Sequence, residues 1–283
     1  VTNTTVNFGG FIYISICGLA INTTVNSGGS VIVRRDDHFS IRGYVARASL
    51  TTVNAGGFMI VASGGSATST RVKAGGYLVI SSGGEAMTTR VISGGKMMVS
   101  SGGSAASTTV NSGGFVAVCS RGSAIATTVN SGGSMIVSSG GSATDTLVSS
   151  GGSMEVWVGS AMSTTVNSGG SMDVWYYGRA TSTTVNSGGT INGFTVLEDQ
   201  YYESEIHISN GYVNGSAHLH FGQTATLTTV NSGGFMEVQG CATSTLVSSG
   251  GSMDVFVGSA INTTVNSGGN MDVWNGGFAT STT

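Results

Sequence analysis

Acidic and aromatic residues recur at a fixed spacing in the C-terminal half of the chain. In most of these repeats a carboxylate stands two residues before an aromatic side chain, and we call the set the acidic–aromatic strip: Glu155, Trp157, Asp173, Trp175, Glu237, Asp254, Phe256, Asp272 and Trp274. Aromatic rings stack on sugars or on other proteins, and carboxylates accept hydrogen bonds from hydroxyl groups. The strip predicts a carbohydrate-binding or self-association surface, with a decorated surface as the plain alternative. Stacked like charges could also hold a weak cation between them.

Residue patterns typical of catalysis or cofactor binding are absent from the sequence. There is no nucleophile elbow, phosphate loop, zinc spacing or calcium nonapeptide. His218 and His220 could hold a metal with Glu203 or Glu205, but exposed polar alternation explains them without one. A cleft able to hold a polysaccharide lyase or hydrolase site could arise only in residues 190–228. We therefore expect no enzyme, no cofactor and no metal site.

The strip lies within a sequence repeat that runs along most of the chain. A valine before an Asn-Ser-Gly-Gly turn returns every 19 residues over long stretches, for instance at Val91, Val110 and Val129, and slightly sooner near the C-terminus. A fixed period of this length is the mark of a solenoid, in which each repeat buries its apolar side chains only by stacking on its neighbours.

Within each repeat the apolar residues stand two apart, which is the spacing of one strand face. The residues expected inside are Met135, Val137, Met172, Val174, Thr127, Val129 and their equivalents, including Val166 and Val273. Double glycines and β-branched residues exclude helices. We predict an all-β fold, a right-handed single-stranded parallel β-helix (β-solenoid) of roughly 14 coils with about 19 residues per coil, each coil flattened around two main strands.

Two stretches depart from the period, and we expect residues 1–283 to form one β-helix segment around them. Residues 34–50 contain a charge run and are predicted to be a loop insertion, either solvated or in contact with a partner. Residues 190–228 are an irregular insertion or lengthened coils. Asn210-Gly211 suggests a projecting hairpin, whereas two lengthened coils would place Ile208 in the position of the repeat valine.

Composition limits the partners of the chain. The net charge of −3, with 8% charged residues, gives no basic field for nucleic acid. Apolar stretches are too short to span a bilayer. Between residues 53 and 148 the outward position of the longer strand is apolar, at Ile60, Val79, Met98, Ala117 and Ile136, which predicts a surface that another molecule covers. Because the chain begins and ends in mid-repeat, we expect a segment of a longer protein.

Residues 141–152 and 161–170 resemble the 19-residue repeats of AIDA-type self-associating autotransporter adhesins. The resemblance implies a bacterial β-helix passenger segment, secreted and displayed at the cell surface from the outer membrane. It further implies adhesion between cells or to a host, biofilm formation and virulence. The partners would be identical molecules on neighbouring cells, and surface glycans or proteins of host or bacteria. A surface-associated carbohydrate-binding or carbohydrate-active protein is the alternative.

The resemblance also implies a glycoprotein, with O-linked heptose added to repeat serines by a heptosyltransferase. The acceptors would be the serines of the Asn-Ser-Gly-Gly turn, namely Ser27, Ser112, Ser131, Ser168, Ser187, Ser232 and Ser267.

Overall fold

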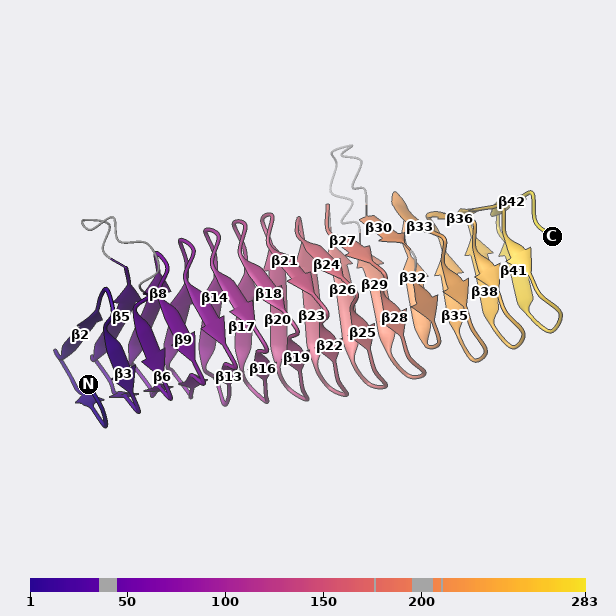
Figure 1. Cartoon of the computed structure of the whole chain (residues 1–283). Helices are drawn as coiled ribbons and strands as arrows, with labels where there is room; N and C mark the ends of the chain where they lie inside the picture. The colour runs from indigo at the N-terminus through magenta and orange to yellow at the C-terminus, as the bar shows by residue number, and fades with distance from the viewer. Residues whose placement is uncertain (36–44, 176, 195–205, 210) are drawn as a thin grey trace. The chain divides into compact units, whose positions relative to one another are not determined.

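The structure is a computed structural model of the whole chain, and it describes residues 1–35, 45–175, 177–194, 206–209 and 211–283. Its contacts divide the chain into two compact units, Val1–Thr144 and Asp145–Thr283. Each unit contains seven coils of parallel strands, many of which are labelled in Figure 1. Within the described ranges, no helix is long and apolar enough to cross a membrane.

Three strands make up each coil of the first unit, and equivalent strands of successive coils form three parallel sheets. Sheet 1 holds the short strands β1 (Thr5–Val6), β4 (Thr24–Val25), β7 (Thr52–Val53), β10 (Arg71–Val72), β13 (Arg90–Val91), β16 (Thr109–Val110) and β19 (Thr128–Val129). Sheet 2 holds the longer strands β2 (Phe11–Ile14), β5 (Ser30–Arg34), β8 (Phe58–Ala62), β11 (Tyr77–Ile80), β14 (Lys96–Val99), β17 (Phe115–Val118) and β20 (Ser134–Ser138). Sheet 3 holds β3 (Leu19–Ile21), β6 (Arg47–Ser49), β9 (Ser66–Thr68), β12 (Glu85–Met87), β15 (Ser104–Ala106), β18 (Ser123–Ile125) and β21 (Ser142–Thr144).

The second unit repeats this arrangement. Its sheet 1 holds β22 (Leu147–Val148), β25 (Thr165–Val166), β28 (Thr184–Val185), β31 (Tyr212–Val213), β34 (Thr229–Val230), β37 (Leu246–Val247) and β40 (Thr264–Val265). Its sheet 2 holds β23 (Ser153–Trp157), β26 (Ser171–Trp175), β29 (Thr190–Phe194), β32 (Ser216–Leu219), β35 (Phe235–Val238), β38 (Ser252–Phe256) and β41 (Asn270–Trp274). Its sheet 3 holds β24 (Ser160–Met162), β27 (Arg179–Thr181), β30 (Ile206–Ser209), β33 (Gln223–Thr226), β36 (Cys241–Thr243), β39 (Ser259–Ile261) and β42 (Phe278–Thr280).

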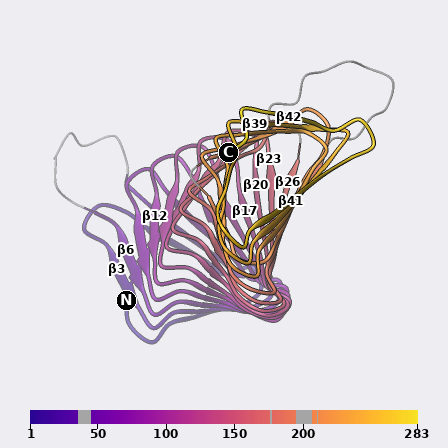
Figure 2. The ribbon, with the colours of Figure 1, turned by 90° about the vertical axis from the view of Figure 1, so that its right-hand side faces the viewer.

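The prediction of an all-β parallel solenoid with about 19 residues per turn is confirmed, but the coil has three strands rather than two. Within each unit the coils lie over one another in Figure 2, with partners such as Val91 and Val110 in direct register. The third strand is short and buries only a small side chain, as Ala67 does in Ser66–Thr68. Alanine is a weak apolar marker, which is why the pattern of Met and Val did not reveal this strand.

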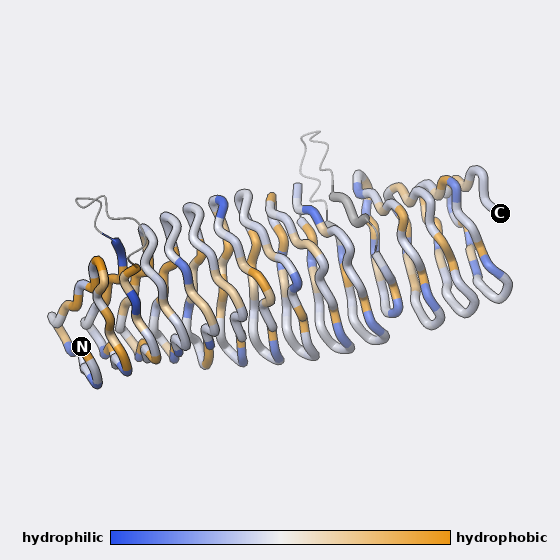
Figure 3. Tube along the Cα trace, viewed as in Figure 1, coloured by the Kyte–Doolittle hydropathy of each residue, from blue (hydrophilic) through white to orange (hydrophobic). Residues whose placement is uncertain are grey.

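The predicted core is confirmed in both units. Met135, Val137, Met172, Val174, Thr127, Val129 and Val166 are all 0–1% exposed, and apolar residues recur along successive coils in Figure 3. Val273 is an exception, with 46% of its surface exposed. Among the described strands, β41 is the edge of sheet 2, so only β38 covers Val273, through its partner Val255.

A column of threonines follows the inner edge of sheet 1, and it leads to a stability prediction. The Oγ1 atom of Thr127 is buried, and no group in the described part of the chain forms a hydrogen bond with it. An unpaired buried hydroxyl costs free energy that the isosteric valine does not. We expect Thr127→Val to raise the free energy of unfolding by about 1 kcal/mol. Urea unfolding measures the change, with the outward Thr128→Val as control; a loss of stability in Thr127→Val alone would show that the hydroxyl has a partner.

The described residues of the 190–228 stretch continue the parallel sheets. Val213 pairs with Val185 and Val230, so Val213 takes the position of the repeat valine. The expectation that Ile208 fills this position is wrong, because Ile208 pairs with Ala180 and Ala225 in sheet 3. Its side-chain size suggested a sheet 1 position, whereas the register places it opposite alanines. Residues 195–205 and 210 lie outside the described residues, as do 36–44 of the predicted 34–50 insertion.

Candidate binding surface

The acidic–aromatic strip lies on the outer face of sheet 2 in the second unit. Because Val156, Val174 and Val255 point into the core, strand alternation turns both neighbours of each valine outward. The register stacks Glu155 on Asp173 and Trp157 on Trp175. At the other end it stacks Glu237 on Asp254 and Asp254 on Asp272, with Phe256 on Trp274. The structure thus brings the predicted residues into an acidic column and an aromatic column.

Three residues that the sequence analysis did not assign to the strip join its two ends. Asn192 stands in register between Asp173 and His218, and His218 stands next to Glu237. His220 Nδ1 lies 3.4 Å from Oε1 of Gln239. The irregular spacing of residues 190–228 hid these positions. The signal that could have found Asn192 is Thr190-Ile191-Asn192, which matches Ser171-Met172-Asp173 with an amide in place of the carboxylate.

At the N-terminal end of the strip the two aromatic rings stack on each other. The rings of Trp157 and Trp175 stack with centroids 4.8 Å apart and planes at 15°. Trp157 Nε1 donates a hydrogen bond of 2.9 Å to Oε2 of Glu155. The two indoles therefore form a rigid wall rather than an open site.

Asp173 lies beside these rings, and its surroundings destabilise its ionised form. Burial raises the pKa of Asp173 and the neighbouring Glu155 carboxylate adds to the rise, while the hydrogen bond of 2.8 Å that Asn192 Nδ2 donates to Oδ1 opposes it. Because the folded pKa lies above the ordinary aspartate value of 3.8, the folded state holds the proton more tightly than the unfolded chain.

The shift predicts a stability change with a definite sign. We expect the contribution of Asp173 to be most favourable below pH 3.8 and to be lost as the pH rises through its raised folded pKa. Asp173→Asn removes the charge and keeps an oxygen for Asn192, so it should stabilise the chain at pH 7 and lose this advantage in acid. Urea unfolding at both pH values tests this; a stabilisation that does not depend on pH would contradict the electrostatic cause.

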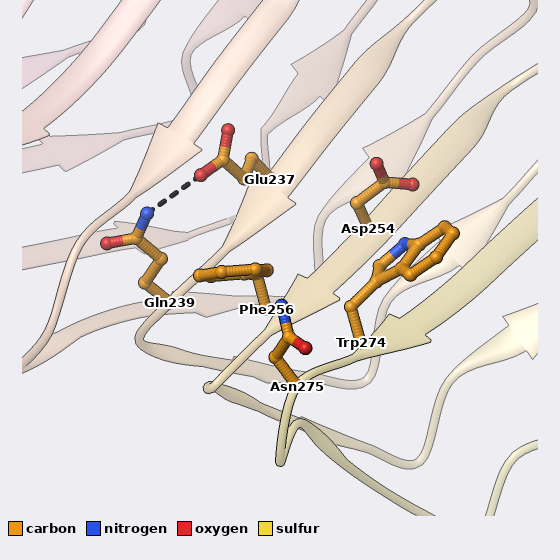
Figure 4. Close-up of a pocket in the computed structure, with 6 residues that line it drawn as sticks. All are labelled: Glu237, Gln239, Asp254, Phe256, Trp274 and Asn275. Atoms are coloured by element: carbon orange, nitrogen blue, oxygen red, sulfur yellow. Dashed lines mark hydrogen bonds between the residues drawn. The ribbon is translucent and has the colours of Figure 1, made fainter.

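At the C-terminal end the strip opens into a pocket, shown in Figure 4. The cavity measures about 340 Å³ and is lined by Glu237, Gln239, Asp254, Phe256, Trp274 and Asn275. Glu237 Oε1 accepts a hydrogen bond of 2.8 Å from Gln239 Nε2, and its Oε2 lies 3.3 Å from His218 Nδ1. The pocket therefore combines carboxylates, amides and rings on adjacent strands.

Glu203 and Glu205, the residues that could join the two histidines at a metal, lie outside the described residues. His218 lies beside Glu237, with 3.3 Å between Nδ1 and Oε2. Within the described parts of the chain, no group of three or more His, Cys, Asp or Glu side chains could hold a metal ion.

The candidate acceptor serines all lie exposed at the turn between sheets 1 and 2: Ser27, Ser112, Ser131, Ser168, Ser187, Ser232 and Ser267. The preceding asparagines stack, as where Asn186 Nδ2 donates a hydrogen bond of 2.7 Å to Oδ1 of Asn167. The glycine of the next coil leaves room for the hydroxyl, because a Cβ on Gly188 would stand 2.6 Å from Oγ of Ser168. The turn thus presents Ser168 at an exposed position beside the glycine of the next coil.

The outward apolar column predicted in the first unit is present on sheet 2. Ile60, Val79, Met98, Ala117 and Ile136 are all partly exposed. Beside them the rings of Phe58 and Tyr77 stack with centroids 5.6 Å apart. This column offers apolar contact area, in contrast to the charged strip of the second unit.

Comparison with known proteins agrees with this architecture. A family model described as an adhesin of the bacterial autotransporter system, probable stalk, matches residues 139–189 and 238–283. No curated protein matches the chain significantly. The chain is similar to the crystal structure of the TibC-catalyzed hyper-glycosylated TibA55-350 fragment, with a TM-score of 0.87 and 38% identity over 99% of this chain and 98% of that one. The chain therefore belongs to the AIDA-type family of bacterial autotransporter adhesins.

Proposed function

We propose that this chain is a surface-displayed passenger segment that joins bacterial cells to one another or to host surfaces, and so promotes biofilm formation and virulence. It would act by self-association with identical molecules on neighbouring cells or by binding surface glycans or proteins. Membership of an adhesin family supports the class of function. The observation that supports a specific contact surface is the acidic–aromatic strip, which exposes rings and carboxylates in register on one face.

Physical chemistry favours the strip as the contact surface. Trp274 and Phe256 are 53% and 39% exposed, and large aromatic side chains supply much contact area at low entropic cost when they bind. The apolar column of the first unit is a second surface that could pack against a partner. Both surfaces are built on strands, so they would meet a partner without prior ordering.

The adhesive role of the strip predicts a large effect of one triple variant. Changing Trp157, Trp175 and Trp274 together to Ser should abolish cell aggregation or glycan retention, because it removes every tryptophan ring of the strip. The assay compares cells that display the full-length protein, and circular dichroism of the purified segment checks that the sheets persist.

A matched triple variant separates the strip from general surface apolarity. Met162, Tyr212 and Leu227 lie in the same unit at 47%, 52% and 56% exposure, and changing all three to Ser should leave aggregation intact. Full aggregation by the tryptophan variant, with normal surface display, would remove the strip from the proposal.

We also propose that the turn serines carry O-linked sugars added by a heptosyltransferase. The exposed turn serines and the stacked asparagines beside them support this, and the similar TibA fragment is described as hyper-glycosylated in a TibC-catalyzed reaction. Intact-mass spectrometry of protein from its native host should show heptose-sized increments. Variants with all seven serines replaced by Ala should lose most of them; an unmodified wild-type mass would refute the proposal.

The alternative function is a carbohydrate-active enzyme, for which the pocket beside Glu237 and Asp254 offers paired carboxylates. Incubation of the segment with bacterial and plant polysaccharides distinguishes the two functions. An adhesin should bind without creating new reducing or unsaturated ends, whereas an enzyme would create them.

A further inference from the structure

The pocket at the C-terminal end of the strip has features that select a ligand. Its volume of about 340 Å³ lies at the lower end of the range of about 300–1,000 Å³ typical of small-molecule sites. Glu237, Asp254, Phe256 and Trp274 line the same space, and in Figure 4 the Glu237 carboxylate turns toward Gln239. A single sugar-sized ring fits these dimensions better than an extended peptide.

The pocket carries negative charge, and no Lys or Arg side chain in this part of the sequence offsets it. Neither Lys nor Arg occurs after Arg179, while Asp272 stacks next to Asp254 and Glu237 on the other side. Burial raises the pKa of Asp254, and the charges of Asp272 and Glu237 raise it further. A positive group placed in the pocket would relieve this repulsion.

The two carboxylates that line the pocket differ in their hydrogen-bond partners. Glu237 is held by Gln239 and lies beside His218. In the part of the chain that the structure describes, Asp254 forms no hydrogen bond or ion pair. Its carboxylate points toward the space beside Trp274 in Figure 4. Asp254 is therefore available to a ligand, and Glu237 is oriented in advance.

The aromatic pair of the pocket is open, unlike the pair at the other end of the strip. Trp157 and Trp175 stack on each other, whereas Phe256 and Trp274, although in register, make no ring contact in the described structure. Exposed ring faces stack on the C–H face of a sugar and also attract cations. Ring faces left exposed in this way suit a ring-shaped ligand.

Other ligands fit less well. A metal ion lacks a set of three ligating side chains among the described residues. A neutral sugar would stack on the rings but would leave the carboxylate repulsion in place. A small ammonium would offset the charge but would not fill the space between Gln239 and Asn275.

We propose that this pocket binds an amino sugar with a free, protonated amine, as found in a de-N-acetylated hexosamine unit of a surface polysaccharide. The sugar ring stacks on Trp274 and Phe256, the ammonium donates to Asp254 and Glu237, and the amides of Gln239 and Asn275 bind hydroxyl groups. The inference deepens the proposed function and rests on it for the strip being a contact surface.

The test uses the fluorescence of one tryptophan. The chain has three tryptophans, so Trp157→Phe with Trp175→Phe leaves Trp274 as the sole reporter beside the pocket. The probes are a β-linked glucosamine disaccharide, its di-N-acetylated counterpart and Nα-acetyl-lysine amide. We expect a saturable change with the glucosamine disaccharide and at least about tenfold weaker binding of the other two, because only the first offers both a ring and a charge.

Two variants locate the binding. Asp254→Asn should weaken binding of the glucosamine disaccharide at least tenfold, whereas Glu85→Gln, on β12 of the first unit, should leave it unchanged. Circular dichroism confirms that both variants fold. Absence of saturable binding would overturn the proposal, as would equal affinity for the acetylated disaccharide or the lysine derivative. Unchanged affinity of the Asp254→Asn variant for the glucosamine disaccharide would also overturn it.

This result is independent of cell adhesion. Amino-sugar binding by the purified segment, with no loss of aggregation in the tryptophan triple variant, would retain the pocket and remove the adhesive role of the strip. Loss of aggregation in the tryptophan triple variant, without amino-sugar binding by the purified segment, would retain the adhesive role of the strip and remove the amino-sugar site.

Discussion

Replacing Val166 by Asp should lower the free energy of unfolding by roughly 4 kcal/mol or more. Val166 is 0% exposed and pairs with Val148 and Val185 in sheet 1 of the second unit. A carboxylate at this position would enter a dry apolar column without a partner. Urea unfolding followed by circular dichroism measures the loss.

The adjacent residue supplies the control for this variant. Thr165 lies one residue earlier on the same strand and points outward, so Thr165→Asp adds the same charge at the surface. We expect its effect to stay within about 0.5 kcal/mol. Equal losses of stability at both positions would mean that Val166 and Thr165 do not point to opposite faces of the strand.

Gly84→Ala should destabilise the first unit by about 3 kcal/mol. A Cβ at Gly84 would collide with the carbonyl oxygen of Val61 on the preceding coil, and this backbone cannot move away without breaking the sheet. The adjacent Gly83 adopts a φ of +75° with nothing within 4 Å of a Cβ. Gly83→Ala should therefore cost only about 1 kcal/mol, from backbone strain alone.

Thermal and urea unfolding of the two alanine variants distinguish close coil contact from conformational strain. A similar loss of stability in both variants would indicate that backbone conformation alone, and not the contact between coils, determines the cost. A larger loss for Gly83→Ala would contradict the packing of this turn against the preceding coil.

The sequence predicted those features that depend on a repeated pattern. Spacing by two assigned Met172 and Val174 to the inside, and from this the outward direction of Asp173 and Trp175 followed without coordinates. Stacking then placed like residues of successive coils together. These inferences hold because one geometric rule applies to every coil.

Features that depend on weak or irregular signals were not predicted. The third strand buries small residues such as Ala67 and Ala86, which carry little hydrophobic signal. The register at Val213 could not be found by dividing a gap evenly, since it is 28 residues from Val185 and 17 from Val230. The pocket forms because the rings of Phe256 and Trp274 stay apart, whereas those of Trp157 and Trp175 stack. The two pairs have the same spacing in the sequence, so the sequence does not distinguish the stacked pair from the open one.

The proposed role of the acidic–aromatic strip as the contact surface can be tested through the tryptophans of the chain. All three lie on the strip, so acrylamide quenching of selectively excited tryptophan fluorescence reports on this surface. Quenching should fall when the purified segment self-associates or binds a glycan, with the largest effect at the exposed Trp274. Association that leaves quenching of all three tryptophans unchanged would show that contact is made elsewhere on the molecule.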